Sequence, residues 1–234
     1  MNIPRWFPDE VAHAGPEHLD PAYVPGYDRK AGTDPTDDVG LLRDLGLSER
    51  HTLVDLGAGT GTFALAAAPY CGRVIAVDVS PVMLARLEEK AGERGIANIA
   101  CVRSGFLSYQ HEGDRADVVY SRNALHHLPD FWKMVALRRI AGILKPGGIF
   151  RLHDLVYSFD PGDAERVFDA WFAGAASTPE DGWTREELET HVRDEHSTFA
   201  WLLEPMLERA GFAIQDVAHS PAGVYSAYTC VTEG

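Results

Sequence analysis

Cysteine is scarce in this chain of 234 residues, with three copies at Cys71, Cys101 and Cys230. Their odd number and wide spacing argue against a disulfide framework or a zinc knuckle, so we expect small buried side chains. The chain also lacks an apolar run of the length that crosses a membrane. Its first residues carry no basic stretch followed by an apolar one, which predicts no signal peptide and a cytoplasmic location.

Positive charge is also in short supply, because 21 Lys and Arg residues stand against 35 Asp and Glu residues and give a formal net charge of −14. A chain of this charge repels phosphate backbones, which argues against nucleic acid as its partner and favours a small molecule. Hydrophobic residues make up 45% and charged residues 24%, the usage of an ordinary globular protein. The sequence does not determine the oligomeric state.

Short apolar runs alternate with helical patterns between residues 36 and 155. We expect strands at 51–56, 73–78, 99–103, 117–121 and 149–153, and helices at 36–46, 60–70, 81–94 and 130–144. Strands that alternate with helices in this way predict an α/β protein with a parallel sheet and helices on both of its faces.

The pattern changes after residue 155. Residues 156–205 are mostly helical, with Thr184 and Glu187 as a capping box, and predict a helical cap inserted after the fifth strand. Apolar runs at 212–218 and 224–231 predict a terminal hairpin. Residues 1–35 are rich in Pro, Gly and aromatic residues and predict an irregular arm with a short helix near 21–30. We therefore expect a single domain over 1–234.

The most informative stretch is the glycine-rich loop Gly57–Gly61 (GAGTG), which follows the first expected strand and opens a helix. Glycines in this position let the backbone turn tightly and approach a ligand closely. The dinucleotide fingerprint G-x-G-x-x-G would need a glycine at position 62, where this chain has Thr62. Asp55 stands where its carboxylate would crowd a pyrophosphate but would favour a cationic ligand. Asp78 ends the second strand, where an acid can accept hydrogen bonds from both ribose hydroxyls.

Four motifs in this order resemble the class I S-adenosylmethionine-dependent methyltransferases: DLGAGTG at 55–61, VIAVDVS at 74–80, SRNALHHLP at 121–129 and KPGG at 145–148. The resemblance implies a doubly wound, Rossmann-like, seven-stranded sheet of order 3-2-1-4-5-7-6 with strand 7 antiparallel. It also implies S-adenosylmethionine as methyl donor, S-adenosylhomocysteine as product, and in-line displacement by a small-molecule acceptor.

The same resemblance assigns residues to the parts of the cofactor. By it, the loop glycines line the methionine part, Asp78 holds the ribose, and Val79 and Met83 flank the adenine. The family often has an Asp near the end of the third strand; this chain has Ser104 there, whose hydroxyl is a candidate substitute. The expected cofactor-binding residues are Tyr27, Asp55, Gly57, Ala58, Gly59, Thr60, Gly61, Asp78, Val79, Met83, Ser104, Gly105, Phe106, Asn123 and Ala124.

Four residues near the expected methyl position are candidates for catalysis. His126 and His127 follow the fourth strand, and His153 and Asp154 end the fifth. An imidazole or carboxylate there can accept a proton from a hydroxyl or amine of the acceptor. The histidine pair is also, and more readily, interpreted as a structural anchor of its loop. We expect no metal site, because adjacent histidines point apart in most backbone conformations and no helix carries an i, i+4 histidine pair.

Two other functions stay open. An NAD(P)-dependent oxidoreductase would share the glycine loop and Asp78, but Thr62, Asp55 and the terminal hairpin disfavour it. A non-catalytic S-adenosylmethionine-binding protein would bind the cofactor without turnover. Against it stands the cap region, since residues 151–205 hold eight aromatic residues, as many as the hundred residues 51–150. This enrichment favours a hydrophobic wall over an acceptor pocket.

Overall fold

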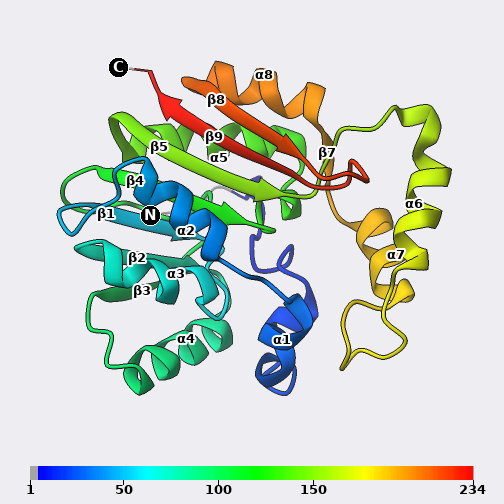
Figure 1. The fold of residues 1–234 in the computed structure, drawn as a ribbon, viewed down its shortest axis with the longest axis horizontal. Helices are drawn as coiled ribbons and strands as arrows, with labels where there is room; N and C mark the ends of the chain where they lie inside the picture. Colours follow the sequence, from blue (N-terminus) through cyan, green and yellow to red (C-terminus); the bar gives the residue numbers. More distant parts are fainter. Residues whose placement is uncertain (1–4, 234) are drawn as a thin grey trace.

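The computed structural model describes residues 5–233, and its centre is a twisted sheet with helices on both faces (Figure 1). The strands of this sheet are β1 Thr52–Leu56, β2 Arg73–Asp78, β3 Ile99–Arg103, β4 Ala116–Arg122, β5 Leu144–Asp154, β8 Phe212–His219 and β9 Ser226–Thr232. The α-helices are α1 Val24–Ala31, α2 Thr36–Asp44, α3 Thr62–Ala67, α4 Pro81–Glu93, α5 Asp130–Ile143, α6 Ala164–Ala173, α7 Arg185–Asp194 and α8 Ala200–Ala210. The strands β6 Val156–Tyr157 and β7 Thr198–Phe199 form a separate pair, and short 3₁₀ turns lie at η1 Pro16–Leu19, η2 Ala68–Tyr70, η3 Leu125–His127 and η4 Pro161–Asp163.

The strand order confirms the predicted fold. The sheet runs β3-β2-β1-β4-β5-β9-β8, and the pairs from β3 through β5 are parallel. Strand β9, the seventh of the sheet along the chain, inserts between β5 and β8 and is antiparallel to both. The carboxyl ends of the parallel strands therefore meet along one edge, which is where open α/β sheets bind their ligands.

The sheet separates two apolar cores, because neighbouring residues of a strand point to opposite faces. Val54 and Leu56 of β1 pack with α5 and α8 on one face, whereas Leu53 packs with α2, α3 and α4 on the other. Helix α8 contributes Leu203 and Leu207, both almost completely buried. Coverage on both faces explains why the central strands appear in the sequence as continuous apolar runs.

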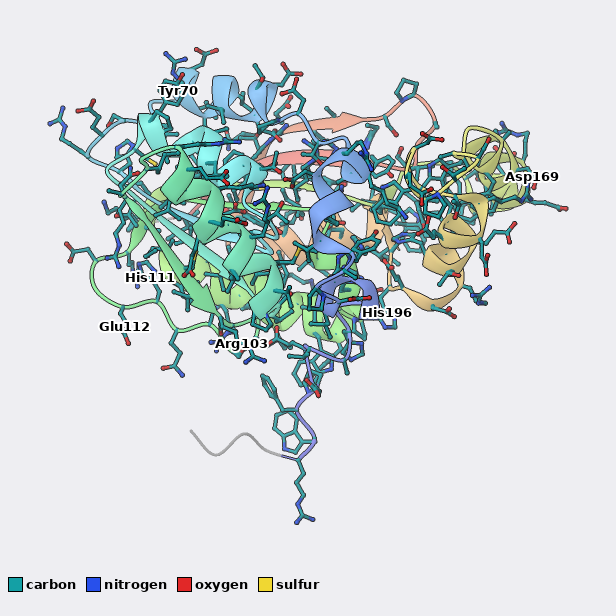
Figure 2. All side chains as sticks on the ribbon, turned by 90° about the horizontal axis from the view of Figure 1, so that it is seen from below. Tyr70, Arg103, His111, Glu112, Asp169 and His196 are labelled. Atoms are coloured by element: carbon teal, nitrogen blue, oxygen red, sulfur yellow. The ribbon has the colours of Figure 1, made fainter. Side chains whose placement is uncertain are left out.

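The cap is a lobe beyond the carboxyl ends of the strands, built by α6, α7 and the β6–β7 pair (Figure 1). Asp169 of α6 lies at its outer end, on the opposite side of the molecule from His111 and Glu112 (Figure 2). Thr184 and Glu187 form the predicted capping box at the start of α7. The cap ends earlier than the sequence predicted, near residue 199 rather than 205, because α8 already belongs to the main core.

The expected arm, residues 1–35, contains η1 and α1 within its described part, while residues 1–4 lie outside the described residues, as does residue 234. Helix α1 covers the predicted segment 21–30 with a small shift toward the carboxyl end. Between residues 5 and 233, none of the helices combines the length and the apolar character that spanning a membrane requires.

A buried ion-pair network ties α2 to the sheet and generates a stability prediction. The Asp38 carboxylate accepts hydrogen bonds from Arg151 Nε at 2.8 Å and from the Tyr120 hydroxyl at 2.8 Å. Replacing Asp38 with Ala removes the acceptor of the buried Tyr120 hydroxyl and of Arg151 Nε, so we expect a loss of about 3–5 kcal/mol in the free energy of unfolding. Urea denaturation measures it. The matched control is Asp37→Ala on the exposed side of the same helix, for which we expect less than about 1 kcal/mol.

Candidate active site

Two adjoining cavities lie at the carboxyl ends of the strands, one of about 370 Å³ and one of about 100 Å³. The residues that line both cavities are His18, Tyr27, Gly57, Gly59, Arg122, Asn123 and His127. The larger cavity extends under the cap, and the smaller one extends along the ends of β2 and β3. The glycine loop and the loop after β4 therefore form the boundary between two compartments of one site.

The smaller cavity brings together the residues that were predicted for the ribose and the adenine. Its further lining residues include Asp78, Val79, Met83, Ser104, Gly105, Phe106 and Ala124. Asp78 Oδ2 accepts a hydrogen bond from Gly59 N and Oδ1 accepts one from Ser80 N, each at 2.8 Å. Burial outweighs these hydrogen bonds and raises the pKa of Asp78 above its usual value. This carboxylate both fixes the glycine loop and lines the smaller cavity.

The loop glycines have different roles. Cβ atoms added at Gly57 and Gly61 would overlap the side chains of Ala124 and Leu87, so close packing inside the protein requires these two glycines. Gly61 lines neither cavity. At Gly59 the atom nearest to an added Cβ would be in the Tyr27 ring, at 3.9 Å, so there is space for it. The backbone φ of +52° nevertheless favours glycine at this position. Gly59 is thus the loop position where backbone faces open cavity space.

Asp55 carries an unusual carboxylate. The side chain is buried at the end of β1, lines the larger cavity with Ala58 and Thr60, and its Oδ2 has no hydrogen-bond partner. Burial, together with the negative charge of Asp78, raises the pKa of Asp55 to about 8. A carboxylate oxygen without a partner, on a residue that lines a cavity, favours a ligand that brings a hydrogen-bond donor with positive charge.

The arm is fixed to the glycine loop. Asp28 accepts hydrogen bonds from the Thr60 hydroxyl and from Lys90 Nζ, the latter at 2.7 Å. Two residues further along the chain, Lys30 pairs with Glu187 of the cap, and its Nζ lies 4.8 Å from the centre of the Trp183 ring. Tyr27 is thereby held at the boundary of the two cavities. Arm and cap meet over the site and close one side of it.

The loop after β4 carries a strained residue at the same boundary. Asn123 has φ +48° and is, within residues 5–233, the non-glycine residue with a positive φ. Its backbone N donates to the backbone oxygen of His153 at 2.8 Å, which connects the loop to β5. Left-handed backbone at a non-glycine residue is uncommon, tolerated best by Asn, and concentrates at functional sites.

The four predicted catalytic residues separate into two groups. His126 and His127 line the larger cavity, whereas His153 and Asp154 line neither cavity. Asp154 is buried and accepts hydrogen bonds from His126 Nδ1 and from the backbone N of Leu125 and of Leu155, the last two at 2.8 Å. A carboxylate engaged on both oxygens and hidden from the cavity positions His126 and does not face an acceptor.

Electrostatics separates the two adjacent histidines. Burial lowers the pKa of each imidazole, but the carboxylates of Asp154 and Glu195 outweigh burial at His126 and raise its pKa to about 9. At His127 burial acts with the positive charge of His126, and its pKa falls to about 3. The pKa values of Asp154 and Glu195 are lowered, because the nearby imidazoles outweigh the effect of burial at both carboxylates.

Sequence reasoning missed several residues of the site. Arg122, Glu195 and His191 line the larger cavity without having been singled out. Arg122 stands next to Asn123 in the third motif and offered a signal. Glu195 and His191 offered none, since they lie in the cap, more than sixty residues from His126 along the chain.

Comparison with known proteins adds an independent finding. Residues 53–148 match a protein family described as "Methyltransferase domain". The uncharacterized methyltransferase YcgJ of Bacillus subtilis is 33% identical over 126 residues, which cover 53% of this chain and 49% of that protein. A ribosomal protein L11 methyltransferase of Symbiobacterium thermophilum is 31% identical over 132 residues, or 56% of this chain and 41% of that protein. The chain thus spans less than half the length of either relative.

A solved structure extends the likeness to most of the chain. A SAM-dependent methyltransferase from Aquifex aeolicus superposes with a TM-score of 0.62 at 18% identity, over 91% of this chain and 98% of that one. At this identity the likeness concerns the fold. The four motifs, the family matched over residues 53–148 and the fold are each similar to those of class I S-adenosylmethionine-dependent methyltransferases.

Proposed function

We propose that this protein transfers a methyl group from S-adenosylmethionine to a small-molecule acceptor. The observation that carries the proposal is the division of the site into two compartments that meet at the glycine loop. One compartment has the residues expected for adenosine, and the other is lined by a buried carboxylate with one unpartnered oxygen and by aromatic residues of the cap. A site of this form holds a donor and an acceptor side by side.

The residues around the glycine loop fit a cationic nucleoside. Asp55 offers a free carboxylate oxygen to an ammonium or sulfonium, and Gly59 presents open backbone. Asp78 keeps acceptor capacity for ribose hydroxyls beyond the two amides it already binds, since a carboxylate has about four lone-pair positions. When bound, S-adenosylmethionine supplies a methyl group on a positively charged sulfur. A diphosphate would meet the carboxylates of Asp55 and Asp78, which disfavours NAD(P).

The acceptor belongs in the larger cavity. Trp171, Trp183 and Tyr225 line it, and its volume of about 370 Å³ is that of a small organic molecule. Among the four candidate catalytic residues, His127 lines both cavities, which places its imidazole beside the junction of donor and acceptor. The main task of the protein is to align the reactants and exclude water, and alignment alone supplies about 7–11 kcal/mol of a reaction barrier.

The proposal is tested by methyl transfer from S-adenosylmethionine labelled in the methyl group, with a pool of small molecules and a pool of proteins as acceptors. We expect label in product that passes an ultrafiltration membrane. Label retained with protein would contradict the small-molecule acceptor. Binding of the cofactor without turnover in either pool would favour a non-catalytic binding protein, and thermal stabilisation by NADH but not by S-adenosylhomocysteine would contradict the donor.

Loss of the Asp78 carboxylate is expected to weaken cofactor binding. Asp78→Ala should lower the affinity for S-adenosylhomocysteine by about 10- to 150-fold, which corresponds to the 1.5–3 kcal/mol of a hydrogen bond to a charged group. Asp78→Asn keeps one acceptor oxygen, so its affinity for S-adenosylhomocysteine should lie between that of Asp78→Ala and that of the wild type. Isothermal titration measures both. Unchanged affinity in Asp78→Ala would remove this residue from the ribose.

Two glycine substitutions should separate ligand approach from internal packing. In Gly61→Ala the new methyl group overlaps Leu87, so we expect a lowered melting temperature of the free protein. In Gly59→Ala the methyl group enters open cavity space, so we expect a smaller change in melting temperature and a larger loss of S-adenosylhomocysteine affinity. Thermal unfolding with and without ligand measures both effects. The opposite ranking would refute close approach of the ligand at Gly59.

Cofactor binding is expected to release a proton from Asp55. Its pKa of about 8 means that the free protein carries this carboxyl mostly protonated at pH 7, and a bound cation favours the ionised form. Affinity for S-adenosylmethionine should therefore rise with pH up to about 8. Titration calorimetry at pH 7 in two buffers of different ionisation enthalpy gives the number of protons released. Asp55→Asn should release fewer protons, and equal release by both proteins would exclude this role.

A further inference from the structure

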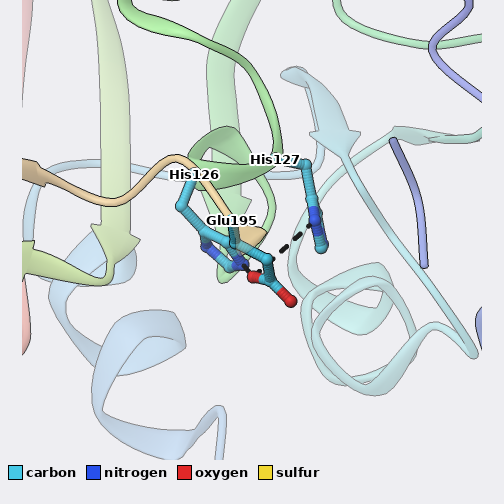
Figure 3. A group of neighbouring side chains, drawn as sticks. All are labelled: His126, His127 and Glu195. Carbon is cyan, nitrogen blue, oxygen red and sulfur yellow. Dashed lines mark ion pairs between the residues drawn. The ribbon is translucent and has the colours of Figure 1, made fainter. Parts of the chain in front are cut away.

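Three imidazole side chains surround one carboxylate oxygen at the edge of the larger cavity. Glu195 Oε2 lies 2.9 Å from His126 Nε2, 3.9 Å from His127 Nδ1 and 2.5 Å from His191 Nδ1. One ligating atom from each of His126, His127 and Glu195 lies within 4.8 Å of the others (Figure 3). The histidine pair comes from η3 and the other two residues from the cap, so the cluster joins the cap to the sheet.

Hydrogen bonds on the far side of the ring orient the imidazoles of His126 and His191. His126 Nδ1 is hydrogen-bonded to Asp154, which is itself fixed by two backbone amides, so Nε2 is the nitrogen that points toward Glu195. His191 Nε2 lies 2.9 Å from the Ser197 hydroxyl, which leaves Nδ1 for Glu195. A carboxylate behind a histidine is the typical outer partner of a metal-binding imidazole, because it fixes both the tautomer and the ring orientation.

Glu195 Oε2, at the centre of the cluster, receives no hydrogen bond of good geometry. Glu195 Oε2 is buried, and although three ring nitrogens lie near it, it has no hydrogen-bond partner. Around a tetrahedral zinc ion, ligand atoms at 2.0–2.1 Å from the metal are about 3.3 Å from one another. The three distances to Glu195 Oε2 lie on both sides of that value, and shifts of less than about 1 Å would reach it.

We propose that His126, His127 and Glu195, with His191 next to them, form a binding site for a divalent transition-metal ion such as Zn²⁺. Nitrogen ligands with one carboxylate favour zinc, copper, iron or nickel over Mg²⁺ and Ca²⁺, which prefer oxygen ligands. Asp154, which the sequence placed among the proton acceptors, is the outer partner of this site. The sequence predicted no metal site, because adjacent histidines point apart in most backbone conformations; the contact with Glu195 was not part of that prediction.

The position of the site indicates what the ion does. All four side chains line the cavity that we assign to the acceptor, so an ion there can bind an acceptor oxygen and lower the pKa of its hydroxyl. This consequence rests on the proposed methyl transfer. Ion binding itself does not, and it is measured without cofactor or acceptor, so that failure of one proposal is distinguishable from failure of the other.

The test is a titration of the full chain, freed of metal by a chelator, with Zn²⁺, Co²⁺ and Mg²⁺ separately. We expect one Zn²⁺ per chain, a visible absorption band when Co²⁺ binds, and no binding of Mg²⁺ at the same concentrations. Absence of Zn²⁺ and Co²⁺ binding would show that the cluster is an ion-pair network only and would overturn the proposal.

Variants locate the ion. Glu195→Ala and His127→Ala are each expected to weaken Zn²⁺ binding at least about 10-fold, the lower limit of what loss of an outer partner alone costs. The matched controls are Glu189→Ala on α7 and His153→Ala on β5, which lie outside both cavities and should bind Zn²⁺ as the wild type does. Melting curves of the metal-free proteins identify a variant that does not fold, in which case the other ligand variant decides. Equal Zn²⁺ affinity in a folded ligand variant and the wild type would place the ion elsewhere and contradict the proposal.

Discussion

The hydrogen bonds from the backbone of Gly59 and Ser80 to Asp78 are the constraint on which the site depends. The bond from Gly59 joins the loop after β1 to the end of β2, and the bond from Ser80 fixes the carboxylate in place, so two strand ends present one surface. Close packing of Gly57 on Ala124 adds the loop after β4 to the same surface. Of the loop glycines, Gly59 is the one whose backbone is left uncovered, and it lies at the junction of the two cavities.

The buried charges around that junction are of two kinds, namely carboxylates that favour a cationic ligand and carboxylates that are paired with imidazoles. At the junction itself, burial and the negative charge of Asp78 raise the pKa of Asp55, so a cationic ligand next to Asp55 favours its ionised form. On the acceptor side, imidazoles and carboxylates alternate from the buried Asp154 through His126 to Glu195, and these charges compensate one another. The net charge of −14 therefore does not describe the site, whose local balance is set by a few buried residues.

The resemblance of the four motifs to a known family predicted the sheet order, and local signals indicated the residues expected at the cofactor. The loop glycines, Asp78 and the residues after β3 each follow a strand end, and parallel topology brings strand ends together. The sequence did not predict which way a side chain points at such an end, so Asp154 was expected at an acceptor although it faces the interior. It also did not relate Glu195 and His191 to His126, because that contact depends on how the cap folds back over the sheet.

The same limit explains the end of the cap. Residues 156–205 share a helical pattern, but the apolar side of α8 covers the main sheet, whereas that of α6 packs in the small aromatic core of the lobe.

A crystal structure with S-adenosylhomocysteine tests the central claim most directly. We predict the adenosine in the smaller cavity, with its ribose on Asp78 and its amino acid part near Asp55. A nucleoside bound elsewhere, or a diphosphate lying on the glycine loop, would contradict it.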